Sequence, residues 1–209
     1  DTGLSIIQDS SVPGVKLKDY IADAPKELLG RRHFSRFGTE LGFLTKIIDS
    51  SVRLNIQAHP TRDLARRYFD SEFGKAEAWY VLGGRSIGGE RPYILLGFKP
   101  GITRDRWVRM VADQDIPALE ASLHRIPVEP GDVYFVPGGM PHAIGAGCMV
   151  AEIQEPTDIT LRVERMADAS GPYPEETYHQ GIGYEKMFEC FDYRGYALPE
   201  LLERVRSVP

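Results

Sequence analysis

The stretch Leu54–Leu82, LNIQAHPTRDLARRYFDSEFGKAEAWYVL, contains the features that decide the fold. Its beginning predicts a short strand over Leu54–His59. Gln57 and His59 are two residues apart on that strand, so their side chains lie on the same face. Pro60 ends the strand, because proline cannot donate a hydrogen bond to a sheet ladder.

A helix and a second strand follow in the same stretch. Thr61 is a suitable N-cap for a short helix, which Gly74 ends. The second strand begins near Glu77, with Trp79 on the same face. Glu77, Gln57 and His59 therefore offer a carboxylate, an amide oxygen and an imidazole on two neighbouring strands. These are three ligand types that one divalent metal accepts.

A fourth candidate ligand lies downstream in GDVYFVPGGMPHAIGAG, residues 131–147. Val133–Val136 is predicted to be a strand. The segment Pro137–Pro141 contains two glycines and two prolines, which favour a tight irregular bend. That bend presents His142 from a loop held by a strand, a common position for functional side chains.

Composition places the chain among ordinary globular proteins. Its 209 residues are 26% charged and 42% hydrophobic, and the net charge is -5. The acidic balance argues against a general nucleic-acid-binding surface. An anionic substrate would need a local cluster of Arg or Lys.

Cysteine usage and hydropathy bear on the compartment. The two cysteines, Cys148 and Cys190, do not form a disulfide framework, which fits a reducing, cytoplasmic location. We expect both to be buried, idle thiols. No run approaches the roughly 20 apolar residues of a membrane span.

Short strands recur along the chain and indicate a mainly β fold. They are predicted over Phe43–Asp49, Pro92–Phe98, Val133–Val136, Cys148–Gln154 and Asp158–Glu164. Helices are predicted after Thr103, over Pro117–His124 with His124 at the surface, and over Pro199–Val208. Residues 165–183 read as a loop, and Tyr184–Cys190 fits either a helix or a strand.

Four motifs carry a resemblance to a known family. Gly131, Pro137, Gly139 and His142 have the spacing of the second motif of the cupin barrel. IQAHP, GKAEAWYVL, PHAIGAG and AEIQEPTDITLR, in that order, resemble the type I mannose-6-phosphate isomerases, also called phosphomannose isomerases. The resemblance runs from about Thr45 to Val163. It implies a mainly β, cupin (jelly-roll-type) barrel with short helical insertions.

The same resemblance implies a set of site residues. The family's four metal ligands match Gln57, His59, Glu77 and His142, which implies one Zn²⁺ per chain. Its catalytic arginine matches Arg162, and two family lysines near the substrate match Lys46 and Lys75.

The general base stays open among Lys46, Lys75 and a water on the metal, with Lys46 first. A lysine acts as a base when burial lowers its pKa. Several residues depart from the family's pattern near the expected sugar and phosphate region. They are Asn55, the segment Gln154–Asp158, Leu161, Val163 and Glu164.

The expected domain organisation has three parts. Residues 1–44 lead into the barrel, residues 45–165 form the metal-binding barrel, and residues 166–209 extend it. The family's second, smaller barrel is expected to be incomplete in this chain.

The function expected from the resemblance is a metal-dependent aldose–ketose isomerase that interconverts mannose 6-phosphate and fructose 6-phosphate. The alternatives are a cupin isomerase of another sugar or sugar phosphate, and a non-catalytic sugar-binding cupin. The expected partner is a small sugar phosphate, with no nucleic acid or membrane. The expected assembly is a monomer or weak homo-oligomer.

Overall fold

The structure, a computed structural model, describes residues 5–9, 11, 13–168 and 171–207. By its internal contacts the chain divides into two compact units, Asp1–Phe43 and Leu44–Pro209. The three-part organisation expected from the sequence stays a prediction.

The first unit consists mainly of three short helices. They are α1 (Leu17–Asp23), α2 (Pro25–Leu29) and α3 (Arg31–Phe37). Pro25 stands at the first turn of α2, where its missing N–H costs no helical hydrogen bond. Gly30 follows α2 at a φ of 82°, a left-handed value that favours glycine and separates α2 from α3.

The second unit contains two five-stranded sheets. The first sheet has the order β1-β8-β3-β6-β12, and the second has the order β5-β4-β7-β2-β9. Every pairing in both is antiparallel. The strands of the first sheet are β1 (Leu44–Asp49), β8 (Cys148–Gln154), β3 (Glu77–Gly84), β6 (Val133–Val136) and β12 (Arg206–Ser207). Those of the second are β5 (Leu123–Pro127), β4 (Tyr93–Phe98), β7 (His142–Ile144), β2 (Gln57–Ala58) and β9 (Leu161–Arg162).

One apolar core lies between the two sheets. Its buried side chains include Trp79 and Val81 of β3, Tyr134 of β6, and Ile94 and Leu96 of β4. A strand that contributes alternate residues to this core keeps the others on its outer face. On the first sheet those outer residues are exposed and apolar. They include Ile47, Tyr80, Phe135 and Ile153.

A second apolar core lies between the second sheet and a layer of helices. Leu95, Ala143 and Leu161 face this layer, where they pack with Trp107 and Phe188. All six residues of β4 are therefore buried. A strand covered on both faces reads as a continuous apolar run rather than an alternating one.

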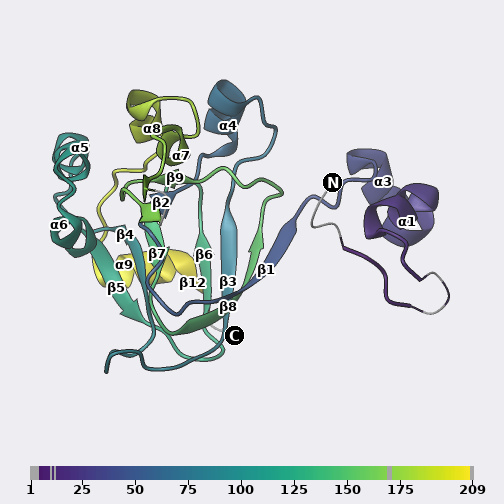
Figure 1. Ribbon diagram of the computed structural model, residues 1–209, viewed down its shortest axis with the longest axis horizontal. Coiled ribbons are helices and arrows are strands. Elements are labelled where there is room, and N and C mark those ends of the chain that lie inside the picture. The colour runs from purple at the N-terminus through teal and green to yellow at the C-terminus, as the bar shows by residue number, and fades with distance from the viewer. Residues whose placement is uncertain (1–4, 10, 12, 169–170, 208–209) are drawn as a thin grey trace. The chain divides into compact units, whose positions relative to one another are not determined.

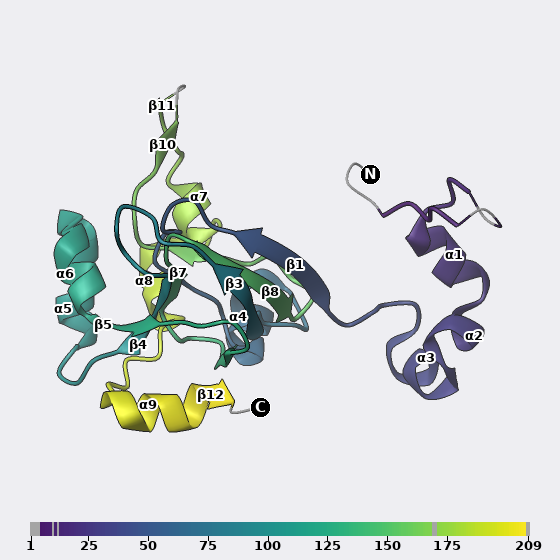
Figure 2. The same ribbon diagram turned by 90° about the horizontal axis from the view of Figure 1, so that it is seen from below.

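The helices of this unit are α4 (Arg62–Phe69), α5 (Arg104–Asp113), α6 (Ile116–Ala121), α7 (Glu176–His179), α8 (Tyr184–Glu189) and α9 (Leu198–Val205). In Figure 1, α4, α7 and α8 lie at the same end of the sheets, the upper end of that view. In both views α5 and α6 lie beside β4 and β5 (Figures 1 and 2). A short hairpin of β10 (Ala167–Asp168) and β11 (Gly171–Pro172) precedes α7.

Several sequence predictions were wrong. The predicted strand Leu54–His59 forms only the two-residue β2, and the helix after Thr61 ends at Phe69 rather than at Gly74. His124 is buried rather than at the surface, because it lies in β5 and its Nε2 is 2.8 Å from the carbonyl oxygen of Tyr196. Asp158–Glu164 forms only the two-residue strand β9. Residues 165–183, read as a loop, include the β10–β11 hairpin and α7.

The coarse fold class is confirmed: the second unit is mainly β, with two antiparallel sheets and added helices. Among the described residues the hydrogen-bonded strands of this unit form two separate five-stranded sheets and the β10–β11 hairpin. A closed barrel therefore stays a prediction. Both cysteines are free and buried, as expected. Within the described ranges no helix has the length and apolar character needed to span a bilayer.

Candidate metal centre and surrounding charged residues

Three of the predicted metal ligands form one buried cluster. The ligand atoms of His59, Glu77 and His142 all lie within 4.8 Å of one another. His59 Nε2 is 3.0 Å from Glu77 Oε1, and His142 Nε2 is 3.8 Å from Glu77 Oε2. The cluster joins both sheets, because Glu77 begins β3 whereas His142 begins β7.

The backbone sets the direction of both imidazoles. His59 Nδ1 is 2.9 Å from the carbonyl oxygen of Ile159, and His142 Nδ1 is 2.9 Å from that of Met140. A carbonyl only accepts, so each Nδ1 carries the proton and each Nε2 keeps its lone pair. Metal-binding histidines are commonly held in this way, with the second ring nitrogen donating to a backbone carbonyl.

The closest pair of atoms in the cluster tests whether a cation fits. His59 Nε2 and Glu77 Oε1 are buried, and neither has a hydrogen-bond partner among the described residues. Two lone-pair-bearing atoms at 3.0 Å repel unless a proton or a cation lies between them, and Lys75 Nζ, 3.3 Å from Glu77 Oε1, contacts only the carboxylate of this pair. The donor set, two imidazoles and a carboxylate, is one that zinc accepts.

The pKa values of these groups favour the protonation states that a metal requires. Burial lowers the pKa of His142 to about 4, helped by the charge of His59, and burial also lowers the pKa of His59. Burial alone would raise the pKa of Glu77, but its close contact with His59 and the nearby positive charge of Lys75 lower it overall. The cluster thus offers neutral imidazoles and an ionised carboxylate near neutral pH, as metal binding needs.

We expect these pKa shifts to make the metal-free protein less stable in acid. The unfolded His142 titrates near 6.5 and the folded one near 4, so between these values the unfolded state binds more protons. The free energy of unfolding should therefore fall as the pH drops from 6.5 to 4, by about 3 kcal/mol from this residue. Urea unfolding of metal-free protein across this range measures the effect. A His142→Gln variant should show a flatter pH dependence, and an equally steep one would contradict the assignment.

Gln57 lies beside the cluster. It is opposite His142 in the β2–β7 pairing, and its Nε2 is 3.3 Å from His142 Nε2. Rotating the amide by 180° exchanges its nitrogen and oxygen, which would bring Oε1 to face the cluster. The structure thus places all four predicted ligands together, and their metal-binding role stays a prediction.

The two predicted lysines approach the cluster from β1 and from the segment before β3. Lys75 is buried, with Nζ 3.3 Å from Glu77 Oε1 and 3.2 Å from Thr160 Oγ1. Lys46 is partly exposed, with Nζ 3.0 Å from Asp158 Oδ1 and 3.7 Å from Glu152 Oε1. Both ammonium groups are therefore paired with carboxylates, and an anionic substrate would compete with these ion pairs.

Arg162 lies in register with Gln57 in the β2–β9 pairing. Its contacts are to the carbonyl oxygens of Thr160, at 3.4 Å, and Thr177, at 3.5 Å. Among the described residues no carboxylate forms an ion pair with it, although Asp158 and Glu164 are near in sequence. Its positive charge therefore stays available to a ligand.

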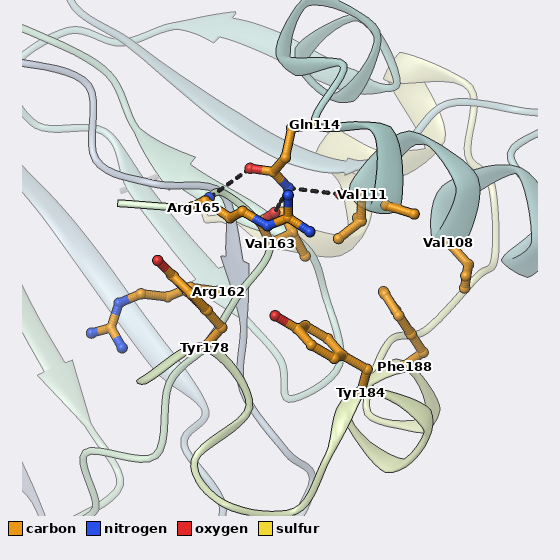
Figure 3. Close-up of a pocket in the computed structure, with 10 residues that line it drawn as sticks. Val108, Val111, Gln114, Arg162, Val163, Arg165, Tyr178, Tyr184 and Phe188 are labelled. Carbon is orange, nitrogen blue, oxygen red and sulfur yellow. Dashed lines mark hydrogen bonds between the residues drawn. The ribbon is translucent and has the colours of Figure 1, made fainter. Parts of the chain in front are cut away.

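Arg162 also borders an apolar cavity of about 250 Å³. The other walls come largely from α5, α8 and the chain after β9, and include Val111, Val163, Tyr184 and Phe188. Figure 3 shows the Arg162 side chain extending away from Tyr184 and Phe188. No residue of the His59–Glu77–His142 cluster lines this cavity, which belongs to the helix-facing side of the second sheet.

The sequence analysis missed Glu152. This carboxylate is buried on β8, and the indole N–H of Trp79 lies 3.2 Å from its Oε2 and 3.1 Å from Glu77 Oε2. Burial raises the pKa of Glu152, and the nearby charge of Glu77 raises it further. The sequence did contain one signal that could have identified Glu152. It occupies an inward-facing position of a predicted strand whose other inward-facing residues are mostly apolar.

Two of the residues that depart from the family's pattern do not border the cluster. Leu161 and Val163 are buried in the core that faces the helices. Glu164 is engaged by Arg53, with Nη1 at 2.6 Å, and by the backbone N–H of Ile56, also at 2.6 Å. The expectation that these positions border the sugar and phosphate stays a prediction.

Comparisons with known proteins agree with this geometry. The family model for "Phosphomannose isomerase type I, catalytic domain" matches residues 4–80. The mannose-6-phosphate isomerase of Streptococcus mutans is 35% identical over 161 residues, which cover 77% of this chain and 46% of that protein. The mannose-6-phosphate isomerase ManA of Bacillus subtilis is 30% identical over 161 residues, which cover 77% of this chain and 47% of that protein.

Solved structures give the same result. The crystal structure of the mannose 6-phosphate isomerase from Bacillus subtilis matches with a TM-score of 0.73 and 26% identity, over 92% of this chain and 56% of that one. A zinc-bound mannose 6-phosphate isomerase matches with a TM-score of 0.68 over 92% of this chain and 64% of that one. Its identity is 16%, so it supports the fold alone.

The fold and the cluster together define a class: two-sheet β proteins with a buried His–Glu–His cluster suited to a metal. Within that class, the chain is similar in sequence and fold to the type I phosphomannose isomerases. It spans about half the length of the curated relatives it matches.

Proposed function

We propose that this chain carries the active site of a metal-dependent aldose–ketose isomerase that interconverts mannose 6-phosphate and fructose 6-phosphate. The observation that supports it best is the buried His59–Glu77–His142 cluster, with Lys75 Nζ 3.3 Å from Glu77, Lys46 beside Glu152, and Arg162 in register with Gln57. A structural metal site needs none of these three cations. The names of the relatives support the same reaction.

The proposal includes one zinc ion per chain, held by His59, Glu77, His142 and Gln57 through its amide oxygen. It also includes a cupin-type barrel, a cytoplasmic location and a monomer or weak homo-oligomer. When bound, zinc acts as a Lewis acid on the sugar oxygens.

The reaction moves a proton between the first two carbons of the open-chain sugar and passes through an enediol-type intermediate. We assign Arg162 to stabilise the negative charge that develops on the oxygens, because its guanidinium has no carboxylate partner among the described residues. Lys75 is buried beside Glu77 and would orient the reacting hydroxyl groups.

The proton itself needs a base that can also return it. Lys46 remains the first candidate from the sequence. Glu152 is a second, because its raised pKa brings the carboxyl closer to neutral pH, where a general acid–base group works best. The two side chains are 3.7 Å apart, so they could act on the same proton.

Removal of the metal is expected to abolish the activity and lower the stability. Purified protein should convert mannose 6-phosphate to fructose 6-phosphate, lose this activity in a chelator, and regain it when zinc is restored. Because a ligand that binds only the folded state stabilises it, the melting temperature should fall with the chelator. Assaying a panel of other hexose phosphates distinguishes a mannose-6-phosphate isomerase from an isomerase of another sugar phosphate. Zinc binding without turnover of any of them would favour a non-catalytic sugar-binding protein.

A further inference from the structure

Gln154 contains a buried acceptor atom that no group in the described structure satisfies. The residue ends β8 and is only 2% exposed. Its Nε2 donates to the backbone oxygens of Thr157 and Glu155, the latter at 3.3 Å. Its Oε1 has no hydrogen-bond partner among the described residues. Such an acceptor is costly to bury unless a donor reaches it.

The orientation of this amide is fixed by its own contacts. Turning it by 180° would place Oε1 against two carbonyl oxygens, Thr157 O and Glu155 O, which can only accept. The unpaired atom is therefore the oxygen and not the nitrogen. It needs a donor, so a group that only accepts cannot satisfy it.

Gln154 lies at the edge of the metal centre. It is directly opposite Glu77 in the β3–β8 pairing, and Glu152 lies two residues earlier on the same inward face. Residues directly opposite in an antiparallel pair have Cβ atoms about 4.5–5.5 Å apart. Two other unpaired buried atoms in the described structure, His59 Nε2 and Glu77 Oε1, belong to the same region and would be satisfied by the proposed metal. A cation shared by those two atoms does not by itself supply a donor to Gln154.

We propose that Gln154 Oε1 accepts a hydrogen bond from one hydroxyl group of the open-chain sugar, which makes Gln154 a specificity-determining residue. The proposal rests on the isomerase function proposed above. A hydroxyl group donates and accepts, whereas the phosphate group mainly accepts, so the chemistry assigns this position to the hydroxyl end of the substrate.

The test is a binding experiment that does not depend on turnover. Zinc-loaded protein is titrated calorimetrically with mannitol 6-phosphate, an open-chain polyol that cannot isomerise, and with analogues that each lack one hydroxyl group. Gln154→Met keeps the side-chain volume but removes the acceptor. We expect this variant to bind mannitol 6-phosphate roughly five- to tenfold more weakly than the wild type.

One analogue should identify the hydroxyl group concerned. The wild type should bind it more weakly than the parent polyol, whereas Gln154→Met should bind both about equally, because the lost contact is shared. Zinc content and melting temperature are measured on every variant. Thr157→Val is the matched control: it removes the Thr157 Oγ1 bond to the Gly74 oxygen, at 2.6 Å, and loosens the same turn without touching Gln154 Oε1. It should keep the wild-type preference among the analogues.

This inference would be overturned if the wild type and Gln154→Met bound the parent polyol with equal affinity. It would also be overturned if every analogue lost the same binding affinity in both proteins. Either result leaves the isomerase function standing if the wild type turns over mannose 6-phosphate. A wild type that holds zinc but neither binds nor converts any hexose phosphate would remove the proposed function and this inference together.

Discussion

Replacing His142 with alanine is expected to yield a folded protein that retains almost no zinc and has no isomerase activity. His142 is buried, its Nε2 points into the cluster, and Met140 holds its other nitrogen. Loss of a residue that merely supports a ligand costs roughly 10- to 100-fold in metal affinity, and loss of the ligand should cost more. Metal analysis after dialysis and an activity assay measure both effects.

His124 provides a matched control for this experiment. It is also a buried histidine with one ring nitrogen close to a backbone carbonyl, but it is not part of the cluster. His124→Ala should lower the stability and leave the zinc content unchanged. Full zinc occupancy in His142→Ala would remove His142 from the set of ligands.

Replacing Arg162 with alanine is expected to preserve the metal and remove the catalysis. The guanidinium lies one strand from Gln57 and has no ion-pair partner in the described part of the chain, so its loss should not disturb the fold. Loss of one preorganised group that stabilises a developing oxyanion costs roughly 10²- to 10³-fold in kcat. Steady-state kinetics with parallel zinc analysis checks this expectation.

Arg165 supplies the comparison, because it is an exposed arginine three residues away that borders the same apolar cavity. Arg165→Ala should keep nearly wild-type kcat. Arg162→Lys retains the charge without the planar guanidinium and should recover part of the activity. Wild-type turnover in Arg162→Ala would reduce Arg162 to a surface residue.

Local chemistry made some elements of the fold predictable. Val133–Val136 and Cys148–Gln154 are strands with the predicted bounds. The helix after Thr61 also begins as predicted, with Thr61 Oγ1 accepting from the N–H of Leu64 at 3.4 Å. In these places residue type and neighbouring glycines or prolines determine the structure.

The errors arose where distant segments decide the structure. His124 is buried because Tyr196, 72 positions later, lies against it. Pairing of β8 with β3 sets Glu152 opposite Trp79, whose indole N–H points at it. Neither pairing can be read from local periodicity. The metal ligands could be predicted only because their motifs resemble those of a known family. The residues alone do not indicate which strands pair and bring these ligands together.

The hydrogen bonds from the two imidazoles to Ile159 and Met140 have a further consequence for how this centre tolerates sequence drift. Both acceptors are main-chain oxygens, which every amino acid provides. The orientation of each imidazole is therefore determined by the path of the backbone and not by the side chains of neighbouring residues. Side chains around the centre can thus change without redirecting the two Nε2 atoms that face Glu77.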